Sequence, residues 1–523
     1  MIRRITAAVA AGAALVLALT ACTNSLAAQL NGGEQPSTGG TTESRAPVTD
    51  GVDLDLLDYY GQTLEWGDCE GVTSDVECAD VTAPLDWSDP AAGDISLAIA
   101  RPSDRPADPQ GSLLINPGGP GSSGVDFLDQ SIAYGGIGEA LFDAYDVVGF
   151  DPRGVGRSTP VTCYTSTSDI DAYLYDIPDA ERGSDAWDEQ STEADTAYAE
   201  ACEANSGDLL EHITTDQAAR DMDLIRAVLG DEKLNYLGFS YGTYLGATYA
   251  ELFPDEVGRF VLDGALDPSI PASEVGRTQI IAFEKSLGTY LENCLGSTDC
   301  PFRGTTDQAL DSVSTLLASL DASPLATSDG RELGADAMST AILAALYSEE
   351  NWPYLTQAFA GALQGDPAAA MFLADFYNGR ENGGYTSNTT DAFNAYNCMD
   401  YPVEEGDTAE ADQQLLDEEA PVLGPYMYGT DVCAEWPYPP TGDRHAITAD
   451  GAAPIVVIGT TGDPATPIQW AESMADNLAS GVMVTYDGEG HTAYGSGSAC
   501  IDDAVETYFT AGTVPADGLE CSA

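Results

Sequence analysis

The sequence predicts an α/β fold with a mostly parallel central sheet and a helical cap inserted before the last strands. Three observations lead to this prediction. Apolar runs at 111–119, 145–154 and 259–268 end in glycine-containing turns, as buried parallel strands do. Between the last two of them, apolar residues recur at helical spacing over 214–230. The alternation of strands and helices stops near residue 269 and resumes near residue 449, so one sheet is interrupted and then completed.

The N-terminal segment has the pattern of an exported lipoprotein. Arg3 and Arg4 precede an apolar, alanine-rich run that is short for a membrane span. Leu19-Thr20-Ala21-Cys22 then resembles the bacterial lipobox, in which the cysteine is diacylated and becomes the mature N-terminus. A plain cleaved signal with an incidental cysteine is the alternative. We predict a lipoprotein signal peptide over 1–21 and, because 22–50 is rich in Thr, Ser, Gly and Asn, a flexible tether there.

The remaining residues divide into three parts. Residues 51–268 carry the first strands and helices and are predicted to form the first part of the α/β core. Residues 269–448 are mostly helical in pattern, with few strand signals, and form the predicted cap insertion. Residues 449–523 return to strands and helices and are predicted to complete the core.

The composition excludes one class of function. The chain has 523 residues, and 18 Lys+Arg against 86 Asp+Glu give a formal net charge of −68. Such a surface repels nucleic acid and anionic lipid, so a nucleic-acid-binding role is excluded. The acidity reflects solubility in the first place. A weaker possibility is that it attracts cationic substrates, such as the free amino end of a peptide.

The cysteine count agrees with export to an oxidising compartment. Cys22 leaves ten further cysteines, an even number. Pairing neighbours along the chain would give five local disulfides, although the sequence leaves the connectivity open. Metal binding is the rival interpretation, but the chain has no CxxC motif and no His-Cys cluster. We therefore expect no metal site. The candidate bridges from neighbour pairing are Cys69–Cys78, Cys163–Cys202, Cys294–Cys300, Cys398–Cys433 and Cys500–Cys521.

A glycine-rich turn holds the candidate nucleophile. Gly238-Phe239-Ser240-Tyr241-Gly242 has the form G-x-S-x-G, follows a predicted strand and opens a predicted helix. This context matches the nucleophile elbow of the α/β-hydrolase fold, in which the strained serine needs neighbours without a Cβ. Ser240 is therefore the predicted nucleophile, and an ordinary glycine-rich turn is the alternative.

A serine hydroxyl needs a base to remove its proton. The chain has three histidines, His212, His445 and His491. His491 ends the segment 481–491, on a glycine-flanked loop after its apolar residues and before the final predicted helix. This is where the fold places its base. His212 and His445 are read as surface histidines, so His491 is the predicted base.

The base in turn needs an acid that orients it. Asp463 lies just past the end of an apolar strand in "IVVIGTTGDPATP". It falls between Ser240 and His491, and the order Ser…Asp…His is that of α/β-hydrolases. Asp463 is the predicted acid, with Asp443 or Asp450 as a distant alternative.

The oxyanion of the reaction needs backbone N–H donors. "NPGGPGSSG" (116–124) follows an early strand, where the hydrolase fold places one donor. We predict that Gly119 supplies one N–H group and Tyr241 the other. An ordinary Gly-Pro turn is the alternative for this segment.

Taken together, these residues resemble the tripeptidyl aminopeptidase branch of the prolyl-aminopeptidase-like α/β-hydrolases, mainly secreted enzymes of actinobacteria with a characteristic C-terminal region. The similarity departs from the prolyl aminopeptidases at Pro117, where their HGGPG motif has histidine. Asp151 and Arg153 match the family's D-x-R-G turn and are interpreted as a structural pair bracing the site. The matching segments are "NPGGPGSSG", "DVVGFDPRGVGRSTP", "TTDQAARDMDLIRAVLG", "YLGFSYGTYLGATYAELFP", "VLDGALDP", "GTTGDPATP" and "GEGHTAYG".

The resemblance implies a serine exopeptidase that acts near the free N-terminus of peptides without a cofactor. In such enzymes carboxylates of the cap bind the substrate's ammonium group, and the candidates here are Glu349, Glu350 and Asp400. A carboxylesterase would use the same triad and is the first alternative. A non-catalytic, peptide-binding lipoprotein is the second. We expect a monomer outside the cytoplasm, anchored to the membrane through a lipid on Cys22 or secreted.

Overall fold

The computed structural model describes residues 45–402, 409–427, 429 and 431–523. The predicted signal peptide, Cys22 and most of the predicted tether lie outside these residues. Residues 45–523 belong to one compact unit. Its first residues already pack on the core, because the Val48 N–H group donates to the Ala227 carbonyl at 2.9 Å and the Val48 side chain lies against the main apolar cluster. The compact unit therefore begins near residue 45, before the boundary at 51 suggested by the sequence.

Among the described residues, the central sheet has ten strands in the order β1-β2-β3-β5-β4-β6-β7-β12-β13-β14. Strands β1 to β3 pair antiparallel at one edge, and the seven strands from β5 to β14 run parallel. The predicted fold class is thus confirmed. The bounds are β1 Gly67–Asp68, β2 Val76–Pro84, β3 Asp94–Pro102, β4 Ser112–Asn116, β5 Asp146–Phe150, β6 Leu234–Phe239, β7 Val257–Asp263, β12 Ile455–Gly462, β13 Gly481–Glu489 and β14 Leu519–Ser522.

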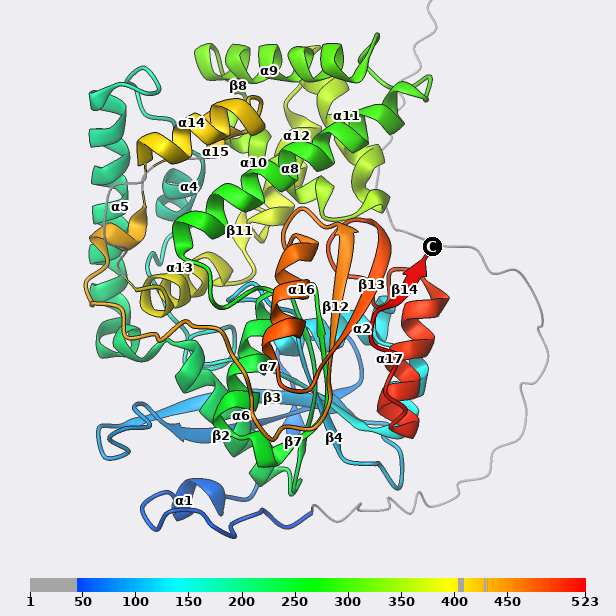
Figure 1. The fold of residues 1–523 in the computed structure, drawn as a ribbon. Helices are drawn as coiled ribbons and strands as arrows, with labels where there is room; N and C mark the ends of the chain where they lie inside the picture. The colour runs from blue at the N-terminus through cyan, green and yellow to red at the C-terminus, as the bar shows by residue number, and fades with distance from the viewer. Residues whose placement is uncertain (1–44, 403–408, 428, 430) are drawn as a thin grey trace, which may run out of the picture. The chain divides into compact units, whose positions relative to one another are not determined.

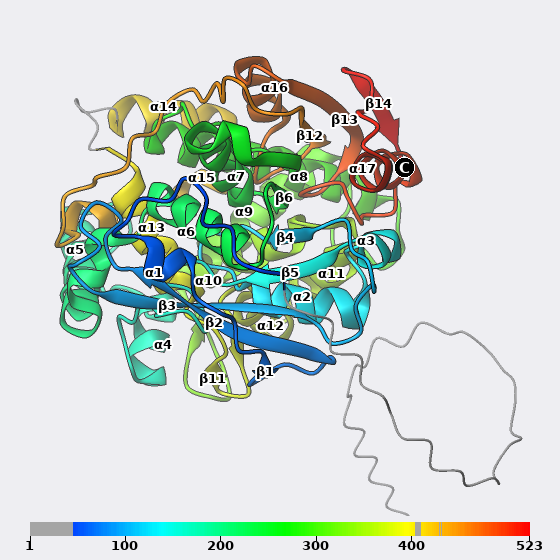
Figure 2. The ribbon, with the colours of Figure 1, turned by 90° about the horizontal axis from the view of Figure 1, so that it is seen from below.

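Helices cover both faces of this sheet (Figures 1 and 2). The central strands β4 and β5 are buried along their whole length, which explains their uninterrupted apolar sequences. One apolar cluster lies under α6 and α7, and another on the opposite face under α2 and α17. The helices of the core are α1 Leu57–Tyr60, α2 Gly124–Tyr134, α3 Glu139–Ala144, η1 Gly207–His212, α6 Thr215–Val228, α7 Tyr241–Leu252, η2 Pro254–Glu256, α16 Ile468–Asn477 and α17 Ala499–Ala511.

The chain between β7 and β12 is mainly helical. It leaves the sheet after β7 and returns to pair β12 directly beside it, with Ile455 opposite Phe260. Its helices build an apolar core of their own and lie above the upper ends of β12 and β13 in Figure 1. The elements are α8 Ala272–Leu295, α9 Thr306–Ala322, β8 Leu325–Ala326, β9 Glu332–Leu333, α10 Ala335–Leu346, η3 Glu349–Asn351, α11 Trp352–Ala362, α12 Ala368–Tyr377, β10 Arg380–Glu381, β11 Gly384–Tyr385, α13 Thr389–Asp400, α14 Ala409–Glu419, α15 Gly424–Met427 and η4 Val432–Glu435.

Two further helices pack with this cap although they precede β6. They are α4 (Thr167–Tyr175) and α5 (Asp185–Ser206), within the range that the sequence assigns to the core. Tyr175 belongs to the apolar core of the cap, and its hydroxyl donates to Asp375 at 2.7 Å. Arg182, in the α4–α5 connection, donates to Asp321 and Asp336 of the cap. The helical layer is thus assembled from two separate stretches of the chain.

The structure contains the five disulfides between neighbouring cysteines. Two of them connect the helical layer: Cys163–Cys202 joins α5 to the segment after β5, and Cys398–Cys433 joins α13 to η4. Closed loops of this size typically add about 2–4 kcal/mol to the free energy of unfolding. The other three bridges are Cys69–Cys78, Cys294–Cys300 and Cys500–Cys521.

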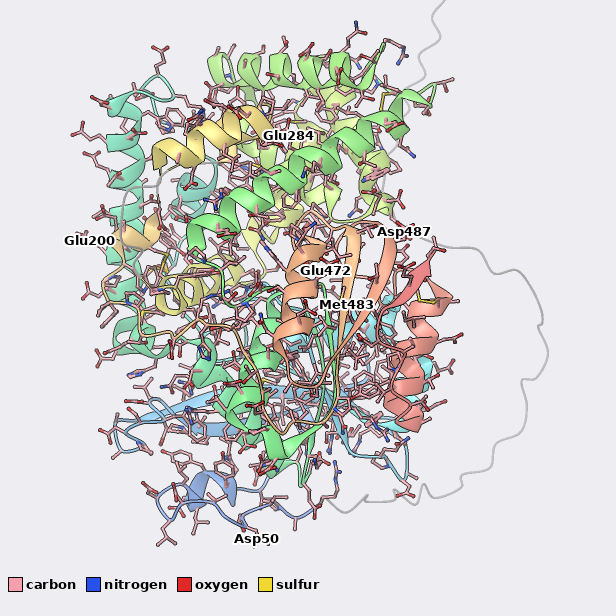
Figure 3. All side chains as sticks on the ribbon, in the orientation of Figure 1. Asp50, Glu200, Glu284, Glu472, Met483 and Asp487 are labelled. Carbon is pink, nitrogen blue, oxygen red and sulfur yellow. A yellow bond between two sulfur atoms is a disulfide. The ribbon has the colours of Figure 1, made fainter. Side chains whose placement is uncertain are left out.

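Many acidic side chains lie on the outside of the molecule, although several are buried. Asp50, Glu200, Glu472 and Asp487 are exposed on four different parts of the fold (Figure 3). Glu284 of α8 is an exception, because its buried carboxylate accepts the N–H groups of Val422 and Leu423. Within the described ranges, no helix combines the length and the apolar character needed to cross a membrane.

Candidate active site

The predicted nucleophile lies on a strained turn between β6 and α7. Ser240 has φ 55° and ψ −125°, a conformation that is costly for a residue with a side chain. The turn is held by the Ser240 N–H group, which donates to the Asp263 carbonyl at 2.9 Å. A Cβ on Gly238 would lie 2.5 Å from the Gly242 carbonyl oxygen, and one on Gly242 would lie 2.7 Å from Oδ1 of Asn116. Both flanking glycines are therefore sterically required.

The predicted base and acid are hydrogen-bonded to each other. Nδ1 of His491 lies 2.9 Å from one carboxylate oxygen of Asp463 and 3.0 Å from the other. Because a carboxylate can only accept, Nδ1 carries the proton and Nε2 is left as the free base. The Asp463 side chain is fully buried, whereas 10% of the His491 side chain is exposed. Asp463 also accepts the N–H groups of Ala465 and Thr466, which fix its orientation.

A second buried carboxylate, Asp263, links the nucleophile turn to the base. It ends β7 and accepts the N–H groups of Ala493 and Tyr494 through its side chain, while its carbonyl accepts that of Ser240. Burial raises the pKa of Asp263 to about 6, although these N–H bonds lower it. The next residue, Gly264, packs closely against the histidine ring, since a Cβ on it would lie 3.2 Å from Cε1 of His491. The sequence analysis missed Asp263, although it ends a buried strand just as Asp463 does.

The electrostatics of the site favour the charged form of the histidine. Burial alone would lower the pKa of His491, but the charge of Asp463 and its hydrogen bond raise it by more, with a further contribution from Asp263. The net pKa lies above the ordinary histidine value of 6.5.

We expect kcat/KM to have an acid limb whose midpoint lies above pH 6.5. As the predicted base, His491 would accept the serine proton only in its neutral form, so each pH unit below its raised pKa should lower kcat/KM about tenfold. A pH–rate profile at subsaturating substrate measures this midpoint directly. A midpoint at or below the ordinary histidine value would contradict the described Asp463–His491 pair.

The loop after β4, which carries Gly118 and Gly119, packs against the nucleophile turn through Gly118. A Cβ on Gly118 would contact Cβ of Ser240 at 2.9 Å and the Tyr241 nitrogen at 3.1 Å. The Gly118 N–H group itself donates to Oδ1 of Asn116 at 3.0 Å. Within the part of the chain that the structure describes, the N–H groups of Gly119 and Tyr241 have no protein acceptor. Both are therefore available to a bound substrate.

The helical cap reaches the base through Tyr347. Its carbonyl accepts the backbone N–H group of His491 at 2.8 Å. Its ring packs edge-on against the imidazole, with 5.3 Å between the ring centroids. The ring of Tyr377, at the end of α12, lies 6.1 Å from that of Tyr347. Sequence reasoning missed both tyrosines, since no motif marks them. The cap thus forms one wall of the site.

Of the three cap carboxylates considered for the substrate's ammonium group, Asp400 is already engaged. It is buried and accepts two hydrogen bonds from Thr215, so it is not free to receive an ammonium group. Glu349 and Glu350 are exposed. Glu489 lies two residues before the histidine. Its pKa is raised mainly by burial and next by the negative charge of Glu349.

The alternative acids and bases lie apart from the Asp463–His491 pair. His445 is half exposed, and its Nδ1 lies 2.8 Å from the Asp443 carbonyl. The Asp443 side chain and Asp450 are exposed. The carbonyl of His212 accepts a hydrogen bond from Arg153.

Asp151 and Arg153 brace the site, but through different partners. Asp151 accepts the Ser123 hydroxyl and the N–H groups of Val125 and Arg157. Arg153 forms a fully buried, two-pronged ion pair with Asp221 of α6, with both distances 2.7 Å. The sequence interpretation of these residues as one pair is therefore corrected to two independent anchors.

Comparison with known proteins adds the family context. A family model described as a TAP-like protein matches residues 420–521. The chain is 33% identical over 479 residues to the serine protease Hip1 of Mycobacterium tuberculosis, which covers 88% of this chain and 91% of that protein. It is 37% identical over 506 residues to carboxylesterase B of the same organism, covering 93% and 94%. It is 31% identical over 475 residues to the tripeptidyl aminopeptidase of Streptomyces lividans, covering 88% and 86%.

Proposed function

This chain belongs to the tripeptidyl aminopeptidase-like family of α/β-hydrolases, and from that premise we propose that it is a serine exopeptidase cleaving peptides near their free N-terminus. The observation that carries the proposal is the 2.9 Å contact between His491 and Asp463, on the loops beside the strained Ser240 turn. A serine whose proton is taken by a neutral imidazole, which is in turn held by a buried carboxylate, performs acyl transfer.

The proposed reaction uses only groups of this chain. Oγ of Ser240 attacks the scissile carbonyl while Nε2 of His491 takes its proton, and the N–H groups of Gly119 and Tyr241 stabilise the oxyanion. His491 then donates that proton to the leaving amine, and the peptide's N-terminal part stays esterified to Ser240. Water, deprotonated by the same imidazole, hydrolyses this ester. Asp463 stays ionised and stabilises the imidazolium throughout.

Two features support a peptide substrate with a free amino group. The relatives include a serine protease and a tripeptidyl aminopeptidase. In addition, Glu349 and Glu489 place negative charge near the His491 loop, where a substrate ammonium group would be attracted. We propose these two carboxylates as the recognition site of the amino terminus, in place of Asp400.

We expect the described enzyme to cleave a chromogenic peptide with a free N-terminus and to leave its N-acetylated twin intact. Acetylation removes the positive charge that the carboxylates would bind and adds bulk at the same position. Both peptides are assayed with wild type and with the Ser240→Ala variant as the blank. Equal cleavage of the two peptides would overturn the exopeptidase assignment while leaving the hydrolase assignment intact.

A second candidate, carboxylesterase activity, is favoured by the relative named carboxylesterase B and by one observation on the structure. On α12, Phe372 is 61% and Phe376 is 68% exposed, and the neighbouring Tyr377 contacts Tyr347, which contacts His491. Exposed aromatic side chains on the same cap helix as Tyr377 could receive an apolar acyl chain. Hydrolysis of a short-chain nitrophenyl ester, with both peptides resistant, would favour this candidate.

We also propose that the protein is exported and carries a lipid on Cys22. The signal-like segment over 1–21 and the five disulfides support export, because such bridges persist in oxidising compartments. The mass of the mature N-terminal peptide distinguishes the outcomes: a diacylglyceryl group on Cys22 supports the anchor, and an unmodified cysteine contradicts it.

A further inference from the structure

The buried carboxylate of Asp400 lies where the cap meets the core. Asp400 is the last residue of α13 and is 2% exposed. Its Oδ1 accepts the Thr215 N–H group at 2.8 Å, and its Oδ2 accepts the Thr215 hydroxyl at 2.6 Å. Thr215 is the first residue of α6, so the carboxylate also lies at the positive end of that helix.

The hydrogen bonds continue in one direction from the core to the cap. The Thr215 hydroxyl lies 2.5 Å from the Tyr241 hydroxyl. An ionised carboxylate has no hydrogen to give, so the single Thr215 hydrogen goes to Asp400. Thr215 can then only accept from Tyr241, whose O–H group is the donor. The result is a directed chain from Tyr241 through Thr215 to Asp400.

The Tyr241 side chain is held at its hydroxyl by these hydrogen bonds and along its ring by packing. Its backbone follows Ser240 directly and opens α7, and among the described residues its N–H group has no protein acceptor. Its ring is buried against Tyr244 of α7 and Tyr396 of α13, with centroids 6.1 and 5.7 Å away. A side chain locked in this way restricts the orientation of the peptide group that carries the N–H.

We propose that Asp400 is a positioning residue: through Thr215 it anchors Tyr241 and thereby aims the Tyr241 N–H group at the oxyanion. The inference rests on the proposed acyl-transfer function, but not on which acyl substrate is used. It also makes the cap part of the catalytic machinery, since α13 supplies the end of the chain. A cap that shifted away from the core would loosen the oxyanion site.

The ionisation of Asp400 depends on its burial and on the groups around it. Burial raises its pKa to about 6, while the two Thr215 bonds and the nearby charge of Arg444 lower it. The Arg444 guanidinium lies between the rings of Tyr244 and Tyr401, 4.2 and 4.0 Å from their centroids. At pH 8 the carboxylate is therefore ionised and accepts both hydrogens.

The experiment removes one hydroxyl and nothing else. Thr215→Val keeps the shape and the backbone N–H group but breaks the chain, whereas Thr215→Ser retains it. At pH 8 we expect Thr215→Val to lower kcat about tenfold with KM within about twofold, because a displaced oxyanion donor loses part of the 10²–10³-fold that its removal costs. Thr215→Ser should stay within about twofold of wild type.

Two further measurements separate positioning from a merely structural role. Tyr249→Phe removes a buried hydroxyl of α7 that donates to Asp223 at 3.3 Å. This variant should lose about as much thermal stability as Thr215→Val but should leave kcat unchanged. The rate constant for phosphorylation of Ser240 by diisopropyl fluorophosphate, in which the Oγ–P bond forms and fluoride leaves, should fall with Thr215→Val in parallel with kcat, whatever the natural substrate.

The outcomes distinguish the inference from the proposed function. If wild type cleaves peptides and Thr215→Val keeps the full kcat and the full rate of phosphorylation by diisopropyl fluorophosphate, the positioning role is overturned and the function stands. If wild type cleaves only esters, the exopeptidase proposal fails, and the same variants test the positioning role on the ester. Equal losses for Thr215→Val and Tyr249→Phe would also overturn it.

Discussion

Replacing Ser240 with alanine is expected to lower kcat about a millionfold and to leave KM and the fold essentially unchanged. The hydroxyl is the only group proposed to form a bond with the substrate, so its loss leaves only the binding groups and the oxyanion donors. Alanine is tolerated at φ 55° about as well as serine, and the turn keeps its N–H bond to the Asp263 carbonyl. Steady-state kinetics and thermal unfolding together measure both parts of the expectation.

The control for this variant is an exposed serine on the cap. Ser319 of α9 is exposed, and Ser319→Ala should retain the wild-type kcat. A Ser240→Ala protein that kept its fold and more than about a thousandth of the activity would contradict the nucleophile assignment. Such a result would favour water attack assisted by His491.

Replacing Asp463 with asparagine is expected to lower kcat about ten-thousandfold. The carboxylate accepts Nδ1–H of His491, and an amide in its place can present its NH₂ group to the ring. The imidazole would then carry its proton on Nε2, where the base must be free. The loss of the negative charge also removes the main interaction that raises the pKa of His491.

Asp450→Asn provides the matched control. Asp450 was the alternative acid from the sequence, is exposed, and should be replaceable without effect on kcat. If Asp450→Asn were the damaging change and Asp463→Asn were mild, the assignment of the acid would be wrong.

The predicted site residues share a property that a sequence can reveal. Ser240, Asp463 and His491 each follow a parallel strand; the strands before Ser240 and Asp463 are mostly buried, and β13 before His491 is partly exposed. The carboxyl ends of parallel strands meet at one edge of the sheet. Their positions therefore follow from strand signals and chain order. The glycines around Ser240 add a steric requirement that is visible in the sequence and agrees with the contacts described above.

Other parts of the molecule depend on contacts that local sequence patterns do not encode. Helices α4 and α5 have ordinary helical sequences, and nothing in them tells which layer they join. Asp400 is one of 86 acidic residues, and only its burial beside Thr215 distinguishes it. Asp263 ends a strand as well, but its role depends on the N–H groups of Ala493 and Tyr494 that it accepts, and no sequence pattern shows these contacts. Side-chain networks between distant segments thus had to come from the structure.

The central claim is that acyl transfer proceeds through Ser240. The most direct measurement is mass spectrometry of the protein after reaction with diisopropyl fluorophosphate, followed by proteolysis to locate the adduct. We predict one diisopropylphosphoryl group per chain, on the peptide containing Ser240, complete loss of activity in parallel, and no adduct in Ser240→Ala. Labelling at another residue, or full activity in a protein labelled at Ser240, would contradict the account.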